Sequence, residues 1–167
     1  MNNTLTLRAL EPDDLEVLYG IENDSDLWDV GTTNVPYSKS SLRNFILNTT
    51  NDIYADKQLR MMICAGEEVV GIVDLMDFDP KNSRAEVGIV IMKPFRRRGY
   101  ALKALALIAK YASEVIHLHQ LYAFVDADNV SSRRLFHQAG YRDESLLKGW
   151  LYDGCRYHDA LLLQFFL

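Results

Sequence analysis

The stretch EVGIVIMKPFRRRGYALKALALIAKYA, residues 86–112, decides how this chain folds and what it can bind. Its beginning predicts a strand, its middle a basic loop, and its apolar second half a helix that starts after Gly99. The first turn of a helix has unpaired N–H groups and carries about half a positive charge. With Arg96, Arg97 and Arg98 beside it, this turn is suited to a pyrophosphate or a similar anion. Gly99 lets the ligand approach the backbone because glycine has no Cβ.

The same stretch resembles the acetyl-CoA loop of the GNAT N-acetyltransferases, whose pattern is Arg or Gln, two residues, Gly, one residue, then Gly or Ala. The matching residues are Arg96, Gly99 and Ala101. A second block of the family matches after a predicted strand at residues 121–126. Its members are an asparagine, a small residue, a leucine-aromatic pair and a glycine-aromatic pair: Asn129, Ser132, Leu135, Phe136, Gly140 and Tyr141. The resemblance extends over nearly the whole chain and points to the spermidine/diamine and ribosomal-protein acetyltransferase branch.

The resemblance implies an α/β fold of the GNAT type, with a mixed, mostly antiparallel central sheet flanked by helices on both faces, in one domain spanning residues 1–167. It also implies acetyl-CoA as the acyl donor. Family members hold the pantetheine arm through main-chain hydrogen bonds of the strand before the loop. The resemblance therefore assigns cofactor binding to Ile89, Val90, Ile91, Arg96, Arg97, Arg98, Gly99, Tyr100, Ala101, Leu102, Asn129, Arg133 and Phe136.

Hydrophobic periodicity places the remaining elements. Alternation at Leu5 and Leu7 predicts a strand, and a helix is expected from Pro12. Ser38 is expected to cap a second helix. Further along we expect a hairpin of residues 59–65 and 69–77, a strand ending near residue 92, helices from residues 99 and 131, and two closing strands on either side of residues 153–154.

Bulk composition fits a single globular domain of 167 residues, 49% of them hydrophobic and 25% charged. No apolar run approaches the roughly 20 residues that span a bilayer, and no leader pattern opens the chain, so we expect a cytoplasmic protein without membrane partners. The net charge of −5 disfavours nucleic-acid binding. The spacing of the four histidines predicts no metal site, and Cys64 and Cys155 are expected to be free thiols.

The end of the chain suggests self-association. Residues 161–167 are apolar and aromatic and predict a final strand with an exposed edge, which pairs readily with a second copy. Because the family resemblance points the same way, we expect a homodimer or a higher homo-oligomer.

Acetyl transfer to an amine poses two proton problems of unequal size. A lysine-like amine with a pKa of about 10.4 must lose a proton near pH 7, which costs roughly 4.6 kcal/mol. A departing thiolate with a pKa of about 8.5 leaves a deficit of only about 2 kcal/mol. The base therefore matters more than the acid. Glu86 stands close to where some family members place a glutamate base and is the candidate; the alternative is that it pairs with Arg84 or another surface cation.

The acid position departs from the family. Many members, including the polyamine acetyltransferases, carry a tyrosine where this chain has Phe136, and its hydroxyl is thought to protonate the coenzyme thiolate. Three alternatives remain: Tyr141, Tyr122 or a water donates the proton; the thiolate leaves unassisted; or the chain is a non-catalytic acyl-CoA-binding module. Because the missing acid addresses the smaller barrier, we expect catalysis, with Tyr141 as the candidate acid.

The expected acceptor is a primary amine, in the first place a polyamine, a diamine or another small amine. Asp74 and Asp77 on the predicted third strand are candidate acceptor-binding residues because the polyamine enzymes also carry acidic residues there. Asp26 and Asp29 could add charge from the polar loop before the second helix. The acidic pair that precedes Pro-Tyr in those enzymes is Asn34-Val35 here. Acetylation of a protein N-terminal or side-chain amine is therefore the alternative.

Overall fold

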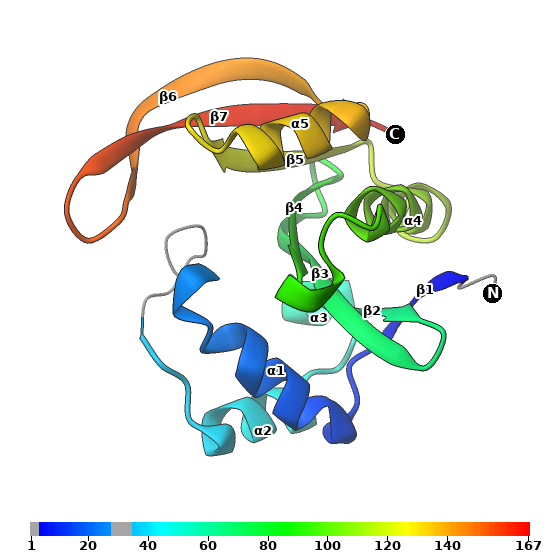
Figure 1. Cartoon of the computed structure of the whole chain (residues 1–167). Helices are drawn as coiled ribbons and strands as arrows, with labels where there is room; N and C mark the ends of the chain where they lie inside the picture. The colour runs from blue at the N-terminus through cyan, green and yellow to red at the C-terminus, as the bar shows by residue number, and fades with distance from the viewer. Residues whose placement is uncertain (1–3, 28–34) are drawn as a thin grey trace.

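The computed structural model describes residues 4–27 and 35–167, which form a seven-stranded sheet with helices on both faces (Figure 1). The strand order is β1-β2-β3-β4-β5-β7-β6, and every neighbouring pair is antiparallel except β4 and β5. The sheet is therefore mixed and mostly antiparallel, as expected. Its strands are β1 Leu5–Ala9, β2 Leu59–Ala65, β3 Glu68–Asp79, β4 Arg84–Ile91, β5 Gln120–Asp126, β6 Arg142–Tyr152 and β7 Tyr157–Phe166.

The described residues contain the α-helices α1 Leu15–Glu22, α2 Lys39–Asn48, α3 Ile53–Asp56, α4 Tyr100–Glu114 and α5 Val130–Gln138. Three of them start at a capping side chain: Ser38 Oγ accepts from Ser41 N–H and Asn129 Oδ1 from Ser132 N–H, both at 3.0 Å, and Asp52 Oδ1 accepts from Tyr54 N–H at 2.9 Å. The cap at Asn129 places the start of α5 one residue before the predicted position. The one-turn helix α3 was not predicted. None of the described helices combines the length and the apolar character that a membrane span requires.

Two apolar cores hold helices on opposite faces of the sheet (Figure 1). One core joins α4 and α5 to the sheet, with Leu105 packed among residues that include Val73. The other joins α1 and α2 to the opposite face, with Leu18 packed among residues that include Ile72. Neighbouring residues of β3 thus enter different cores because successive side chains of a strand point to opposite faces. This arrangement confirms the expectation of helices on both faces.

Strands β4 and β5 pair only where they begin. Their register joins residues 84–86 with residues 120–122, and the last pair is Glu86 with Tyr122. Both strands continue beyond that pair, to Ile91 and Asp126. On its other side β4 stays paired with β3 as far as Ile91. Residues 87–91 therefore have one edge without a strand partner in the described sheet, and we call it the open edge of β4.

The chain closes in a long curved hairpin of β6 and β7 (Figure 1). The expectation that the last strand forms an exposed edge is wrong, because β7 pairs with β5 on one side and with β6 on the other. Its apolar composition reflects an interior position in the sheet, where residues such as Leu163 are fully buried. The edge of this half of the sheet is β6, so the sequence argument for self-association through the final strand does not hold.

Candidate functional site

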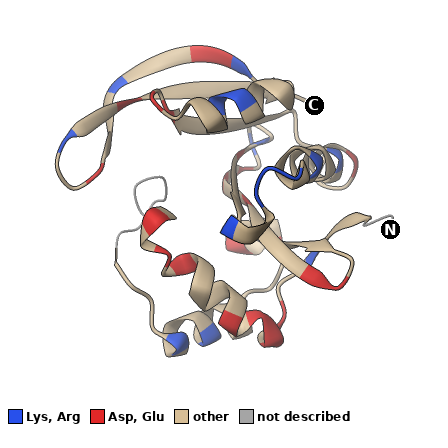
Figure 2. Ribbon diagram, in the orientation of Figure 1, with Lys and Arg blue, Asp and Glu red and all other residues tan. Residues whose placement is uncertain are grey.

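The turn that leads from β4 into α4, residues 96–102, has free donors and positive charge. Gly99 is the N-cap of α4 with a φ of 78°, and the first helical bond runs from Lys103 N–H to Gly99 O at 3.2 Å. The N–H groups of residues 100–102 precede that bond and have no partner inside the helix. Figure 2 shows a basic segment that enters the helix at this point. We call residues 96–102 the anion turn.

Local contacts fix the shape of the anion turn. Arg96 Nε donates to Ile91 O at 2.9 Å, which closes the turn onto the end of β4. The guanidinium of Arg98 lies over the Phe95 ring, 5.7 Å from its centroid. A Cβ placed on Gly99 would meet no atom within 4 Å. The glycine is thus required by its positive φ, and the space in front of its backbone is left open to a ligand.

Glu86 is half-buried at the last residue pair before the open edge of β4 begins. Burial, together with the negative charge of Asp77, raises the pKa of Glu86 to about 7. Burial and the charge of Glu86 also raise the pKa of Tyr122, its partner across the strands. Arg84 pairs with Asp79 at 3.2 Å, and the described ion pairs include none between Arg84 and Glu86. A carboxyl group with a pKa near 7 is suited to accept a proton at neutral pH.

An irregularity in β3 brings Asp77 into the electrostatic range of Glu86. The register between β3 and β4 shifts between Met76 and Asp79, and Asp77 adopts a φ of 46°. Such a bulge redirects side chains at the end of a strand. Asp77 is exposed and Glu86 is half-buried, so one carboxyl group faces solvent and the other lies deeper at the start of the open edge.

Asp74 lies further along β3 and is already paired. Arg60 donates from Nε and Nη2 to the two carboxylate oxygens of Asp74, both at 2.8 Å. The same guanidinium forms a second ion pair with Glu22, at the end of α1. All three side chains are largely buried. The geometry therefore makes Asp74 part of an internal ion-pair network and disfavours it as a binding group for a cationic acceptor.

Asp26 is also paired, although at the surface. Lys93 Nζ lies 2.6 Å from a carboxylate oxygen of Asp26 and 3.3 Å from one of Asp24. Lys93 belongs to the 3₁₀ turn Lys93–Phe95 that precedes the anion turn, so this contact connects the loop after α1 to the end of β4. Asp29 lies outside the described residues, and its predicted contribution remains a prediction.

Phe136 and Tyr141 lie in the core beneath α5. Their rings meet edge-on with centroids 5.0 Å apart, and Tyr141 stacks on Phe165. Burial raises the pKa of Tyr141, and its hydroxyl has no hydrogen-bond partner. Tyr122, in contrast, is only partly buried and adjoins Glu86. The geometry favours Tyr122 over Tyr141 as a proton donor.

The start of α5 presents further polar groups. Asn129 uses its Oδ1 as the helix cap, which leaves its amide N–H groups for other acceptors. Arg133 donates from Nη1 to Ala127 O at 3.1 Å. A hollow of about 550 Å³ lies against α5 and is lined by Val130, Arg133, Arg134, His137 and Gln138. Its two arginines make this surface suitable for a phosphate group of a cofactor.

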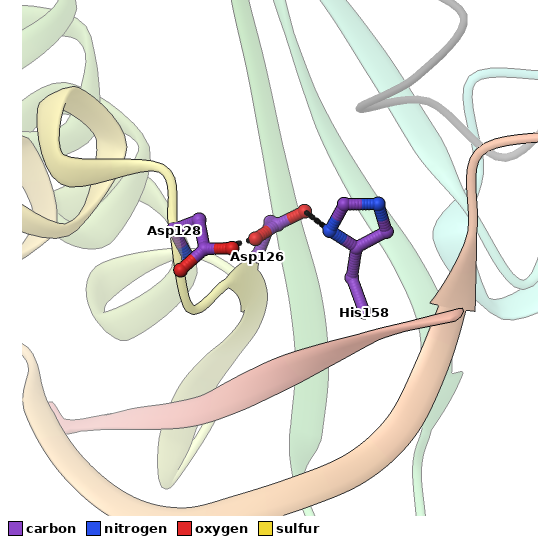
Figure 3. Close-up of side chains that lie close together, drawn as sticks. All are labelled: Asp126, Asp128 and His158. Atoms are coloured by element: carbon purple, nitrogen blue, oxygen red, sulfur yellow. Dashed lines mark hydrogen bonds and ion pairs between the residues drawn. The ribbon is translucent and has the colours of Figure 1, made fainter. Parts of the chain in front are cut away.

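One cluster of side chains was missed by the sequence analysis. Asp126 ends β5, Asp128 follows in the turn before α5, and His158 lies near the start of β7 (Figure 3). One ligand atom from each lies within 4.8 Å of the others. The histidine spacing that predicted no metal site considered neighbours along the sequence only. The pairing of β5 with β7, which joins residue 126 to residue 160 and leaves residue 158 two positions further along β7, could have revealed the cluster.

Comparison with known proteins agrees with this architecture. The family model of the acetyltransferase (GNAT) domain matches residues 4–142. A spermidine N(1)-acetyltransferase of Vibrio cholerae is 25% identical over 96% of this chain and 91% of its own length. YdaF of Bacillus subtilis, provisionally named a ribosomal N-acetyltransferase, is 28% identical over 96% of this chain and 90% of its own length.

Solved structures show the same fold. The crystal structure of spermidine N-acetyltransferase from Vibrio cholerae in complex with CoA and spermine superimposes with a TM-score of 0.88 at 23% identity, and covers 99% of this chain and 96% of that one. A dodecameric structure of spermidine N-acetyltransferase from the same organism gives a TM-score of 0.81 at 24% identity, covering 99% of this chain and 95% of the other.

Proposed function

The chain belongs to the GNAT acetyltransferase family, and from this premise we propose that it transfers the acetyl group of acetyl-CoA to a primary amine of a polyamine, a diamine or another small amine. One observation carries the proposal: an open strand edge, residues 87–91, leads through a single 3₁₀ turn into the anion turn, and Glu86 stands at the beginning of that edge. These features fit an acyl donor whose extended, amide-containing arm pairs with the open edge and whose pyrophosphate binds at the anion turn.

The donor is proposed to bind mainly through backbone groups. The pyrophosphate accepts from the N–H groups of Tyr100, Ala101 and Leu102 and is neutralised by Arg96–Arg98. The pantetheine arm lies along the open edge and pairs with main-chain groups of residues 89–91. The amide of Asn129 and the guanidinium of Arg133 face donor groups from the start of α5. Phe136 contributes through packing alone, because it is buried in the core.

Glu86 is the proposed general base. Its raised pKa, about 7, matches the pH at which an amine proton must be removed. Because the amine holds its proton to a pKa of about 10.4, this is the larger of the two proton problems. Asp77 keeps negative charge beside the base, which favours a cationic acceptor there. After the tetrahedral intermediate collapses, the thiolate takes a proton from Tyr122 or from water.

The proposed class of acceptor rests on the acidic side chains near Glu86 and on the similarity to two named relatives. Glu86 and Asp77 supply acidic groups on β4 and β3, and beside α1 the two carboxylates of Asp24 and Asp26 share a single cation, Lys93. The Vibrio cholerae relative is named for spermidine acetylation, which supports a polyamine. The Bacillus subtilis relative, named provisionally for a ribosomal substrate, supports an amine of a protein as the second candidate. A homo-oligomer and a cytoplasmic location belong to the same proposal, the former supported by the dodecameric structure from Vibrio cholerae.

A thiol-release assay tests the proposal directly. Acetyl-CoA is supplied with a panel of acceptors: spermidine, spermine, a short diamine, a monoamine, and a peptide with a free N-terminus. We expect release of CoA thiol with the polycationic amines and an acetylated amine in the products by mass spectrometry. Faster turnover of the peptide would select the second candidate. Binding of acetyl-CoA without turnover of any amine would contradict transfer and identify an acyl-CoA-binding module.

A further inference from the structure

The cluster of Asp126, Asp128 and His158 joins three separate segments at one point (Figure 3). Asp126 is the last residue of β5, Asp128 lies in the turn that leads to α5, and His158 is the second residue of β7. His158 Nδ1 lies 3.5 Å from Asp126 Oδ2. The three ligand atoms lie within 4.8 Å of one another. An ion bound by all three would lie about 2.1 Å from each atom, so the side chains need to move together only slightly.

The orientation of the His158 ring is fixed from outside this cluster. Its Nε2 lies 2.6 Å from Asp153 Oδ2. The other oxygen of Asp153 accepts from the backbone N–H groups of Cys155 and Arg156, at 2.7 and 2.8 Å, so the carboxylate itself is held in place. When Nε2 donates to Asp153, the remaining nitrogen, Nδ1, faces Asp126. Histidines that bind metals are usually oriented in this way, with the distal ring N–H donated to a carboxylate.

Carboxylates surround the His158 ring. Asp126 faces one ring nitrogen and Asp153 the other. Asp128 adds a further negative charge within the cluster. Arg156, whose Nε lies 3.3 Å from His158 Nε2, supplies positive charge on the Asp153 side. On the Asp126 side, Nδ1 and the two carboxylates together offer donor atoms to a metal ion.

The surroundings leave room for a hydrated ion. A hollow of about 260 Å³ is lined by Ala127, Asp128, Arg156, Tyr157, His158 and Asp159. It adjoins two of the three ligand side chains, so water molecules can complete a coordination shell and an ion can enter from solvent. Asp128 is exposed, whereas Asp126 and His158 are partly buried, which gives an open site with one solvent-facing ligand.

We propose that Asp126, Asp128 and His158 form a binding site for a divalent transition-metal ion of the Mn²⁺ or Zn²⁺ type, with water as the remaining ligands. One imidazole nitrogen with two carboxylates is a mixed donor set that suits these ions better than Ca²⁺ or Mg²⁺, which prefer oxygen alone. The bound ion ties the start of β7 to the turn between β5 and α5. The site does not take part in the proposed acetyl transfer, and its test does not depend on that activity.

Mn²⁺ is the probe for this site, because the exposed thiol of Cys155 would compete for Zn²⁺. The full chain is titrated without acetyl-CoA, whose phosphates bind Mn²⁺ themselves, and bound ion is counted by electron paramagnetic resonance. We expect one saturable site with hyperfine coupling to a directly bound nitrogen. Mn²⁺ should also raise the melting temperature more than equal Mg²⁺ does.

Four variants separate this site from other acidic surfaces. Asp128→Asn removes an exposed ligand and should weaken Mn²⁺ binding by about tenfold or more, and Asp153→Asn should weaken it by about tenfold through the ring orientation. Asp13→Asn removes an exposed carboxylate elsewhere and should leave affinity unchanged. His158→Gln should abolish the nitrogen coupling, with folding checked by circular dichroism.

Two results would overturn the proposal. If Mn²⁺ shows no saturable binding, the three side chains contact one another without forming a metal site. If Mn²⁺ binds without nitrogen coupling, or binds Asp128→Asn as tightly as the unchanged chain, the ion occupies another acidic surface.

Discussion

The donor side and the acceptor side of the proposed site are built in different ways. On the donor side, residues 87–102 form one continuous segment that offers backbone groups, a glycine with positive φ and three arginines. On the acceptor side, carboxylates come from separate segments, and Asp74 and Asp26 are already paired with cations. The difference teaches that recognition by backbone is encoded locally, whereas recognition by side chains depends on the partners that folding supplies.

The largest effect is expected on the acceptor side, at the base. Glu86→Gln should lower kcat/KM by about 10²-fold or more, because a positioned general base contributes about 10²- to 10⁴-fold. With a pKa of about 7 for Glu86, kcat/KM of the unchanged enzyme should fall as the pH drops below 7 and the base becomes protonated. The variant should lack this inflection, and its optimum should move up towards the amine pKa of about 10.4.

The matched control is Glu67→Gln, which changes an exposed carboxylate in the turn between β2 and β3. Its pH profile should match that of the unchanged enzyme. If Glu86→Gln also matches it, Glu86 is not the base, and the amine proton leaves through water or through another group.

On the donor side, Gly99→Val should weaken acetyl-CoA binding by about 30- to 100-fold, measured by calorimetry. The positive φ of 78° strains a β-branched residue, at a cost of about 1–3 kcal/mol, and the new side chain occupies the space left for the ligand. Gly154→Val is the control, because Gly154 has a φ of 95°, equally open surroundings and a position at the tip of the β6–β7 hairpin. If Gly99→Val binds acetyl-CoA as tightly as the unchanged chain does, the pyrophosphate does not bind at the anion turn.

Substitution of two tyrosines on different sides of the sheet tests which of them donates the proton. Tyr122→Phe should lower turnover by less than about 30-fold, since the thiolate deficit is only about 2 kcal/mol. Tyr141→Phe should change turnover little and leave stability equal or higher, because the Tyr141 hydroxyl is buried without a partner. Phe136→Tyr should also have little effect. A loss confined to Tyr141→Phe would restore Tyr141 as the acid.

The smallest effect concerns stability. Glu86 has a folded-state pKa of about 7, above the ordinary value of 4.5, so folding penalises its charged form and stability falls as the pH rises from 4.5 to 7. Glu86→Gln should therefore be more stable than the unchanged chain at pH 8, by about 1 kcal/mol after allowance for solvent screening. At pH 4 the two should be equal. Urea denaturation at both pH values measures the difference, and equal stability at pH 8 would show that Glu86 titrates normally.

The sequence predicts the locally encoded features of this molecule better than the features that depend on contacts between distant segments. Strands β2 to β5, the long helix α4 and the anion turn follow from periodicity and from Gly99, because their determinants are local. Arg60 lies opposite Asp74 in the register of the predicted hairpin, so this pair was within reach of the sequence, whereas Glu22, the second anion on the same guanidinium, lies 38 positions away on another element. The proposed metal site joins residues 126 and 158, which lie close together because β5 pairs with β7. The interior position of β7 was mispredicted because an apolar strand looks the same at an edge and in the middle of a sheet.

Amide hydrogen exchange with and without CoA tests most directly the claim that backbone groups of the open edge and the anion turn hold the donor. CoA should slow exchange within residues 89–91 and 100–102, while exchange in the β6–β7 hairpin tip stays unchanged. If calorimetry shows that CoA is bound and exchange at residues 89–91 and 100–102 is the same as in the free chain, the donor lies elsewhere and the account is wrong.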